Sequence, residues 1–133
     1  MAALDDAAFS AALGARPSTL LELADSARLG GRPGRARDAL LAARARHHVT
    51  GSTAFLLGKV SADQLKSSAD ALRWFETYLA EQPSGVFAEQ ALARILEIHS
   101  AGPGDGARAA ASRYLAAHPN GSRAALARSV LER

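Results

Sequence analysis

The sequence predicts an all-α fold, and its composition, its turn residues and its internal repetition all indicate this class. Of the 133 residues, 32 are alanine, the strongest helix former, whereas aromatic residues make up 5%. β-branched residues are scarce, and no segment alternates apolar and polar side chains with the period of two that is typical of strands. Glycine and proline divide the chain into segments of helical length. We therefore expect helices joined by short turns.

Seven helices are expected between these breaks, at 17–30, 34–47, 52–62, 67–81, 86–100, 105–117 and 122–131. Pro17 suits the first turn of a helix, and Gly30 suits the left-handed position at its C-terminal end. Apolar residues at spacings of three and four mark the buried faces of several others: Ala36, Leu40 and Ala43; Leu72, Phe75, Tyr78 and Leu79; Leu92, Ile95 and Leu96; Ala107, Ala111 and Tyr114. Residues 1–13 form an eighth expected helix.

Internal repetition predicts how these helices are organised. The segment Tyr-Leu-Ala-Glu-Gln-Pro-Ser-Gly at 78–85 recurs as Tyr-Leu-Ala-Ala-His-Pro-Asn-Gly at 114–121, a shift of 36 residues. A leucine followed by a tiny residue recurs at 23–24, 57–58 and 92–93, where the tiny residue lets a second helix approach closely. A helix pair buries only part of its apolar surface, so successive pairs must stack. We expect three hairpin repeats, 17–48, 50–83 and 86–119, stacked as an α-solenoid in one domain.

The two ends fit the same pattern. Residues 1–14 match the second helix of a partial preceding repeat, and 121–133 match a C-terminal capping helix. The chain is therefore expected to be a piece of a longer protein.

The Leu-Ala or Leu-Gly pairs, the stripes of alanine and larger apolar residues, and the terminal Pro83 and Pro119 resemble tetratricopeptide repeats. The resemblance covers about 17–119, and it departs from the family at His48, which replaces the terminal proline in the first repeat. It implies a right-handed solenoid of antiparallel helix hairpins. It also implies a non-catalytic module that binds a protein or peptide in a concave groove lined by the first helix of each pair.

A narrower resemblance concerns 20–33, 53–59 and 87–94, which are similar to the repeats trailing myxobacterial FecR-type anti-sigma regulators. This resemblance implies a bacterial envelope or signalling regulator. The protein would be periplasmic if it belongs to a membrane-anchored regulator, and otherwise cytoplasmic.

The partner-binding groove is expected to use the exposed faces of the first helices, with the residues Leu21, Asp25, Arg28, Ser52, Phe55, Lys59, Phe87, Gln90, Arg94 and Glu97. Asp25, Lys59 and Arg94 occupy equivalent places, so the groove is mixed in charge. This favours an extended peptide or a partner helix, with Phe55 and Arg94 as anchors. Phe55 and Phe87 fit equally well as core residues between adjacent hairpins, and this alternative stays open.

The charge distribution leaves two further interpretations open. The net charge is +3, and a basic stretch consists of Arg28, Arg32, Arg35, Arg37, Arg44 and Arg46, with one acidic residue among them. It predicts either a solvated helix face or binding to an anionic surface or nucleic acid. No aromatic residues interleave with the arginines to stack on bases, which disfavours nucleic acid. A third interpretation is a structural spacer that oligomerises through exposed terminal helices.

Residue patterns typical of enzymes are missing from the sequence. It has no Gly-x-Ser-x-Gly elbow, no phosphate-binding glycine loop followed by lysine, and no cysteine. Its histidines, His47, His48, His99 and His118, lack the one-turn spacing of a helical zinc pair. We expect no enzyme activity, no metal site and no cofactor. No apolar run approaches the roughly 18 residues needed to span a bilayer, so no transmembrane segment is expected.

Overall fold

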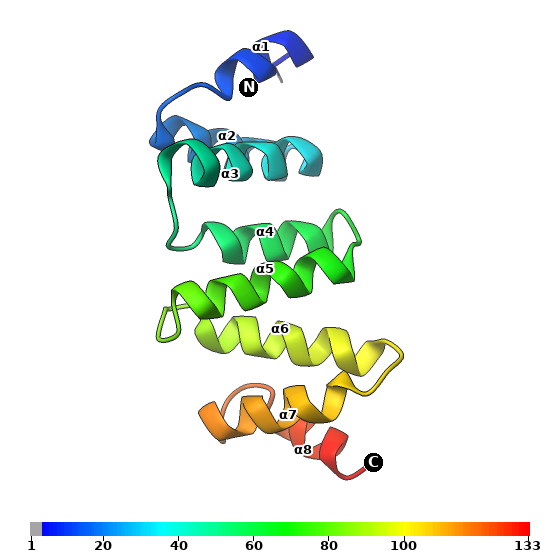
Figure 1. The fold of residues 1–133 in the computed structure, drawn as a ribbon. Coiled ribbons are helices and arrows are strands. Elements are labelled where there is room, and N and C mark those ends of the chain that lie inside the picture. The colour runs from blue at the N-terminus through cyan, green and yellow to red at the C-terminus, as the bar shows by residue number, and fades with distance from the viewer. Residues whose placement is uncertain (1–3) are drawn as a thin grey trace. The chain divides into compact units, whose positions relative to one another are not determined.

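The computed structural model describes residues 4–133 (Figure 1). The described helices are α1 (Asp6–Ala12), α2 (Pro17–Leu29), α3 (Pro33–His47), α4 (Thr53–Asp63), α5 (Ser68–Glu81), α6 (Ala88–Ala101), α7 (Gly106–Ala117) and α8 (Ala124–Leu131). No strand occurs within residues 4–133, and the all-α prediction is confirmed. Helices α2 to α8 begin and end within two residues of the predicted bounds. Helix α1 is shorter than the predicted 1–13, of which 1–3 lie outside the described residues.

The structure divides into two compact units, Met1–Ala71 (unit 1) and Leu72–Arg133 (unit 2), with the boundary inside α5. In unit 1, α2 packs against α3, and α3 packs against α4. In unit 2, α7 packs against both α6 and α8. The boundary falls inside the predicted repeat 50–83, so the single domain and the repeat limits stay predictions.

The ends of α2 follow from its terminal residues. Pro17 occupies the first turn, where its missing N–H removes no helical hydrogen bond. At the other end the left-handed position belongs to Gly31, with φ of 73°, and not to the predicted Gly30, whose φ is −83°. The N–H of Arg32 then reaches the carbonyl of Ala27 at 2.7 Å, and the N–H of Gly31 reaches the carbonyl of Arg28 at 3.3 Å. This is a Schellman motif, and it turns the chain directly into α3.

Small residues fill the close contacts between helices, as the repeat pattern predicts. In unit 1, Ala24 is 4% exposed, and Ala36 and Ala43 are fully buried. In unit 2, Ala111 is fully buried, and Ala93 is 8% exposed. A methyl side chain at these places lets neighbouring helix backbones approach closely. Most other predicted inner positions are buried as well, whereas Leu72 and Ala107 are only partly buried.

Two turns in unit 2, 36 residues apart, have the same hydrogen-bonding geometry. The buried hydroxyl of Tyr78 accepts the backbone N–H of Phe87 at 3.0 Å, just before α6. The buried hydroxyl of Tyr114 accepts the backbone N–H of Arg123 at 3.0 Å, just before α8. Each turn is closed by a 3.0 Å bond from the glycine N–H to the carbonyl three residues earlier. The recurrence of 78–85 at 114–121 therefore corresponds to a local structural repeat.

Gly85 and Gly121 occupy these turns because a side chain would not fit. Neither residue has a positive φ, so their backbone conformation does not require glycine. A Cβ atom at Gly85 would collide with the Tyr78 hydroxyl, and one at Gly121 would collide with the Tyr114 hydroxyl. The glycine and the tyrosine in each turn are therefore coupled by steric contact.

Candidate functional site

The predicted groove residues of unit 1 lie on α2 and around α4. Asp25 is exposed, and its carboxylate lies 3.8 Å from the guanidinium of Arg28, one turn along α2. On α4 the ammonium of Lys59 lies 6.0 Å from the centre of the Phe55 ring. Leu21 is partly buried against the cluster formed by Leu20, Ala42 and Ala43, and Ser52, which precedes α4, is exposed.

The prediction of Phe55 as an exposed anchor is corrected by its burial. Only 2% of the residue is exposed, so its ring is not available to a partner. Helical periodicity places Phe55 on one face of α4, but it does not say what covers that face. The alternative left open by the sequence, in which Phe55 belongs to the core, agrees with the structure.

In unit 2 the structure brings three predicted groove residues together in one pocket. Gln90, Arg94 and Glu97 follow one another on the same face of α6. With Ala93, Ser122 and Arg123 they line an open, shallow pocket of about 270 Å³. The fourth predicted residue, Phe87, precedes α6, and its ring centre lies 6.2 Å from that of Tyr78. We call this depression the α6–α8 pocket.

The wall formed by Ser122 and Arg123 is held against α6 through Glu89. The Glu89 carboxylate accepts the backbone N–H of Ser122 at 3.2 Å, the hydroxyl of Tyr114 at 3.1 Å and the Ser122 hydroxyl at 3.4 Å. His118 lies 3.7 Å from the other carboxylate oxygen. The Ser122 N–H and then the Tyr114 hydroxyl lower the pKa of Glu89 below its ordinary value, so the carboxylate stays ionised. This wall is preorganised.

The charges in the α6–α8 pocket are mixed. The Nε of Arg123 donates to the Glu97 carboxylate at 2.6 Å, and this hydrogen bond raises the pKa of Arg123. Both side chains are partly exposed, with 48% of Arg123 and 35% of Glu97 accessible. Gln90 adds an exposed amide, which can both donate and accept. Together with Arg94 these groups can pair with the backbone and with charged side chains of a peptide.

Sequence reasoning missed Ser122 and Arg123, because 121–133 was assigned to a capping helix. The 36-residue shift could have identified Arg123. It maps Phe87, a predicted groove residue, onto Arg123, as it maps Gly85 onto Gly121. No local sequence pattern could have identified Glu89, because its partners Tyr114 and Ser122 lie 25 and 33 residues away.

The basic stretch of 28–46 is largely engaged within unit 1. Arg35 donates to the carbonyl of Leu4 and to Asp6. Arg44 donates to the Thr53 hydroxyl at 3.1 Å, and Arg46 donates to the carbonyl of Leu13 at 2.6 Å. Arg28 and Arg37 contact the acidic side chains Asp25 and Asp38. These contacts compete with any anionic ligand, so they weigh against the stretch as a ready-made anion site.

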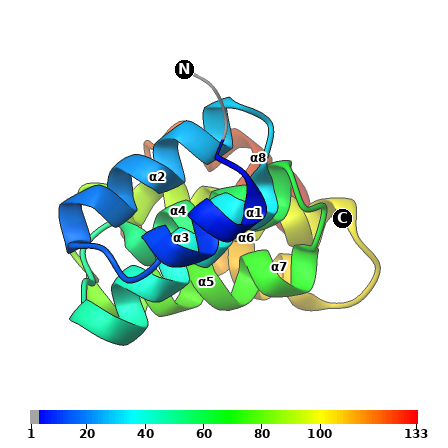
Figure 2. The same ribbon diagram turned by 90° about the horizontal axis from the view of Figure 1, so that it is seen from above.

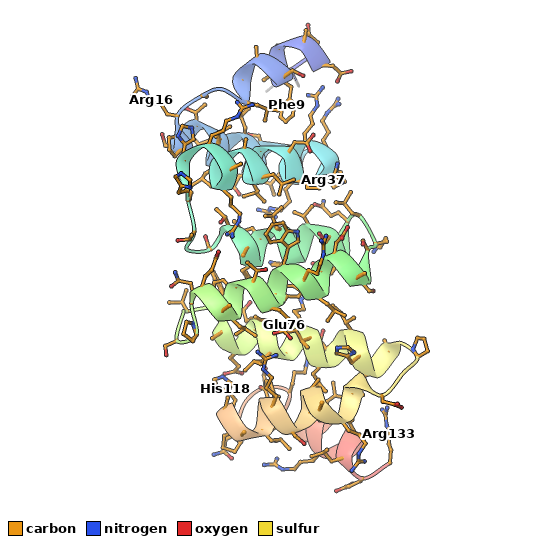
Figure 3. All side chains as sticks on the ribbon, in the orientation of Figure 1. Phe9, Arg16, Arg37, Glu76, His118 and Arg133 are labelled. Carbon is orange, nitrogen blue, oxygen red and sulfur yellow. The ribbon has the colours of Figure 1, made fainter. Side chains whose placement is uncertain are left out.

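Two of the histidines, His47 and His118, have structural contacts at helix ends. The Nε2 of His47 lies 2.9 Å from the carbonyl of Ala15. His118 lies at the C-terminal end of α7 (Figure 3), and its ring centre is 5.7 Å from that of Tyr114. Within the described part of the chain, no three His, Cys, Asp or Glu side chains are grouped to hold a metal. No helix among residues 4–133 is long and apolar enough to cross a membrane.

Comparison with protein-family models, with curated proteins and with solved structures finds no match to this chain. The candidate site therefore rests on the geometry of the α6–α8 pocket.

Proposed function

We propose that this protein is a non-catalytic binding module that recognises a peptide or protein segment, with the α6–α8 pocket as part of its recognition surface. The observation that carries the proposal is the convergence of Gln90, Arg94 and Glu97, predicted as groove residues, with Ser122 and Arg123 in one pocket. These residues offer amide, guanidinium, carboxylate and hydroxyl groups, and Glu89 holds the wall formed by Ser122 and Arg123 in place against α6. Preorganised polar groups reduce the entropic cost of ordering the surface when a partner binds.

We further propose that the helices form tetratricopeptide-type hairpin repeats, about three in number, stacked as a right-handed solenoid. The recurring tyrosine–glycine turns before α6 and α8 support this proposal, because they give unit 2 an equivalent connection at two places 36 residues apart. The buried small residues Ala24, Ala93 and Ala111 also support it, since they are the close-contact positions that such hairpins need.

The mixed charge favours a peptide over a polyanion as the ligand of this pocket. Glu97 lies among the arginines and would repel a row of phosphates, whereas a peptide can offer its own acidic and basic side chains. Arginine is also enriched among the residues that dominate protein interfaces. An extended segment carrying an acidic residue and a backbone amide for Gln90 suits this arrangement.

The test is selection of peptides from a random library against the full chain, followed by calorimetric titration. Charge reversal in Arg94→Glu and Glu97→Arg should each weaken binding of the selected peptides at least tenfold. Ser112→Glu, an exposed change on α7 outside the pocket, is the matched control and should leave Kd unchanged. Unchanged affinity in both pocket variants would refute the proposal, and so would failure to select any peptide.

We also propose that the module belongs to a bacterial envelope or signalling regulator. This proposal depends only on the resemblance of 20–33, 53–59 and 87–94 to the repeats of FecR-type anti-sigma regulators. Fractionation of the tagged, natural full-length protein tests it. Recovery with the periplasm or envelope is expected for an anchored regulator, and recovery entirely in the cytoplasm would contradict the periplasmic assignment.

A further inference from the structure

Two arginine–glutamate pairs link helices within unit 2, and they use different nitrogens of the guanidinium. The Nη1 of Arg113, on α7, donates to both carboxylate oxygens of Glu76, on α5, at 2.7 and 2.9 Å. Arg123, just before α8, donates to Glu97, on α6, through Nε at 2.6 Å. In the view of Figure 2, α5 and α7 lie on one side of unit 2 and α8 lies on the other. The two arginine side chains are similarly exposed, at 46% and 48%, so geometry rather than exposure distinguishes them.

The bond through Nε leaves the outer edge of the Arg123 guanidinium, formed by Nη1 and Nη2, available to a ligand. These two nitrogens carry four of the five N–H donors of an arginine. Among residues 4–133, no acceptor contacts either of them. Parallel donation from Nη1 and Nη2 fits the two oxygens of one carboxylate, and such charge-assisted pairs are stronger than neutral hydrogen bonds. Arg123 can therefore bind a carboxylate without breaking its bond to Glu97.

The position of this outer edge is fixed at both ends of the residue. The backbone N–H of Arg123 donates to the buried Tyr114 hydroxyl at 3.0 Å, which holds the start of the side chain. The bond to Glu97 holds the guanidinium itself. An arginine held in this way loses less conformational entropy on binding than a freely moving side chain. Glu97 is therefore a positioning residue for Arg123.

The other groups of the α6–α8 pocket suit an acidic residue within a peptide. The lining contains two guanidiniums, those of Arg94 and Arg123, and one carboxylate, that of Glu97, so one added carboxylate balances its charge. The exposed amide of Gln90 can bond a peptide group next to the acidic residue. Because the pocket is shallow and open, a bound chain can continue beyond it in both directions. A side-chain carboxylate therefore fits better than the terminal carboxylate of a chain.

We propose that the outer edge of Arg123 binds the side-chain carboxylate of an internal aspartate or glutamate of the partner peptide, and that Glu97 positions this edge. The inference rests on the proposed function of the α6–α8 pocket. It names the chemical group of the peptide that the pocket recognises and the residue that recognises it.

The experiment titrates the full, isotopically labelled chain with small probes and follows the Nε–H signal of Arg123 by NMR. N-acetyl-aspartate N-methylamide presents a side-chain carboxylate between two peptide groups, its asparagine analogue is the neutral control, and N-acetyl-alanine presents a terminal carboxylate. The aspartate probe should bind about tenfold more tightly than the asparagine probe, as expected for a charge-assisted pair, and more tightly than N-acetyl-alanine. Equal binding of the aspartate and asparagine probes would overturn the proposal. Equal or tighter binding of N-acetyl-alanine would overturn it in favour of a chain terminus.

Variants separate geometry from charge. Arg123→Lys keeps the positive charge but loses the paired donors, so it should weaken binding of the aspartate probe about tenfold. Glu97→Ala removes the acceptor for Nε and should weaken binding about threefold, whereas Glu97→Gln keeps an acceptor and should bind as the wild type does. Arg113→Lys is the matched control outside the pocket and should leave Kd unchanged. Unchanged affinity in Arg123→Lys, or unchanged or tighter binding in Glu97→Ala, would overturn the proposal, because charge alone would then account for binding.

Failure of this inference and failure of the proposed function give different results. Selected peptides that depend on Arg94 and Glu97 but bind equally well to Arg123→Lys would retain the pocket as a peptide site and overturn the role of Arg123. Binding of the aspartate probe at Arg123, without any selected peptide, would retain the carboxylate site and refute peptide recognition.

Discussion

Steric coupling between Gly121 and Tyr114 makes a prediction that a double-mutant cycle can test. A Cβ atom at Gly121 would collide with the Tyr114 hydroxyl and would lie 3.0 Å from the Cζ of that ring. Tyr114 is fully buried, so its ring has no solvent into which to move. Gly121→Ala should therefore destabilise unit 2, and Tyr114→Phe should relieve part of that cost by removing the colliding oxygen.

The magnitudes follow from packing and hydrogen bonding. Overpacking of a well-packed site costs about 1–3 kcal/mol. The loss of glycine freedom in the unfolded chain offsets about 0.4–1 kcal/mol of this. Tyr114→Phe alone removes the acceptor for the Arg123 N–H and should cost about 1 kcal/mol or more. In the double variant the added methyl occupies space that the hydroxyl has left. Its total destabilisation should therefore fall short of the sum by about 1 kcal/mol.

The assay is urea unfolding followed by far-ultraviolet circular dichroism for the wild type, both single variants and the double variant. The sister cycle, Gly85→Ala with Tyr78→Phe, should couple with the same sign because its turn has the same geometry. Gly34→Ala combined with Tyr114→Phe is the control, since Gly34 lies in the other unit and an added Cβ would meet the Arg37 guanidinium only at an ordinary contact distance of 3.9 Å. Additivity within about 0.5 kcal/mol in the Gly121 cycle would refute the steric argument.

Three other predictions concern stability. Because the pKa of Glu89 is lowered on folding, its stabilising effect is present above the unfolded pKa and is lost as pH falls. The urea midpoint should therefore drop more between about pH 5 and pH 3 in the wild type than in Glu89→Gln, and equal pH profiles would contradict this. Phe55→Ala should lower the free energy of unfolding by about 3–5 kcal/mol, as for a core residue. A loss below about 1 kcal/mol would contradict the assignment of Phe55 to the core. Ala111→Leu should cost about 1–3 kcal/mol in thermal unfolding while Ser112→Leu, on an exposed neighbour, costs little; similar melting temperatures would argue against close helix contact at Ala111.

The helix bounds could be predicted because their determinants are local. The proline at the start of α2 and the glycines at its end act within one turn of the chain, and so does the helix preference of alanine. The close-contact alanines could be identified as well, because their spacing repeats along the sequence.

The remaining features depend on contacts between distant residues. The sequence predicted that the arginines of α3 form either a solvated face or a site for an anionic partner, but Arg35 and Arg46 bind carbonyls 31 and 33 residues away. Nothing near these arginines in the sequence identifies such partners. The burial of Phe55 likewise depends on what packs over α4. In the candidate site, the residues of α6 could be predicted from helical periodicity. Ser122 and Arg123 could not, because the turn that places them beside α6 is held by Tyr114 and by Glu89, which is distant in the sequence.

The central proposal, peptide recognition at the α6–α8 pocket, is tested most directly by an amide chemical-shift map. The isotopically labelled chain is titrated with a peptide selected against it, and the shifts of assigned amides are compared. Peptide recognition at this pocket predicts that the largest shifts cluster at Gln90, Arg94, Glu97, Ser122 and Arg123. Largest shifts on the exposed face of α7 around Ser112, or along α1 and α3 with unit 2 unchanged, would contradict it.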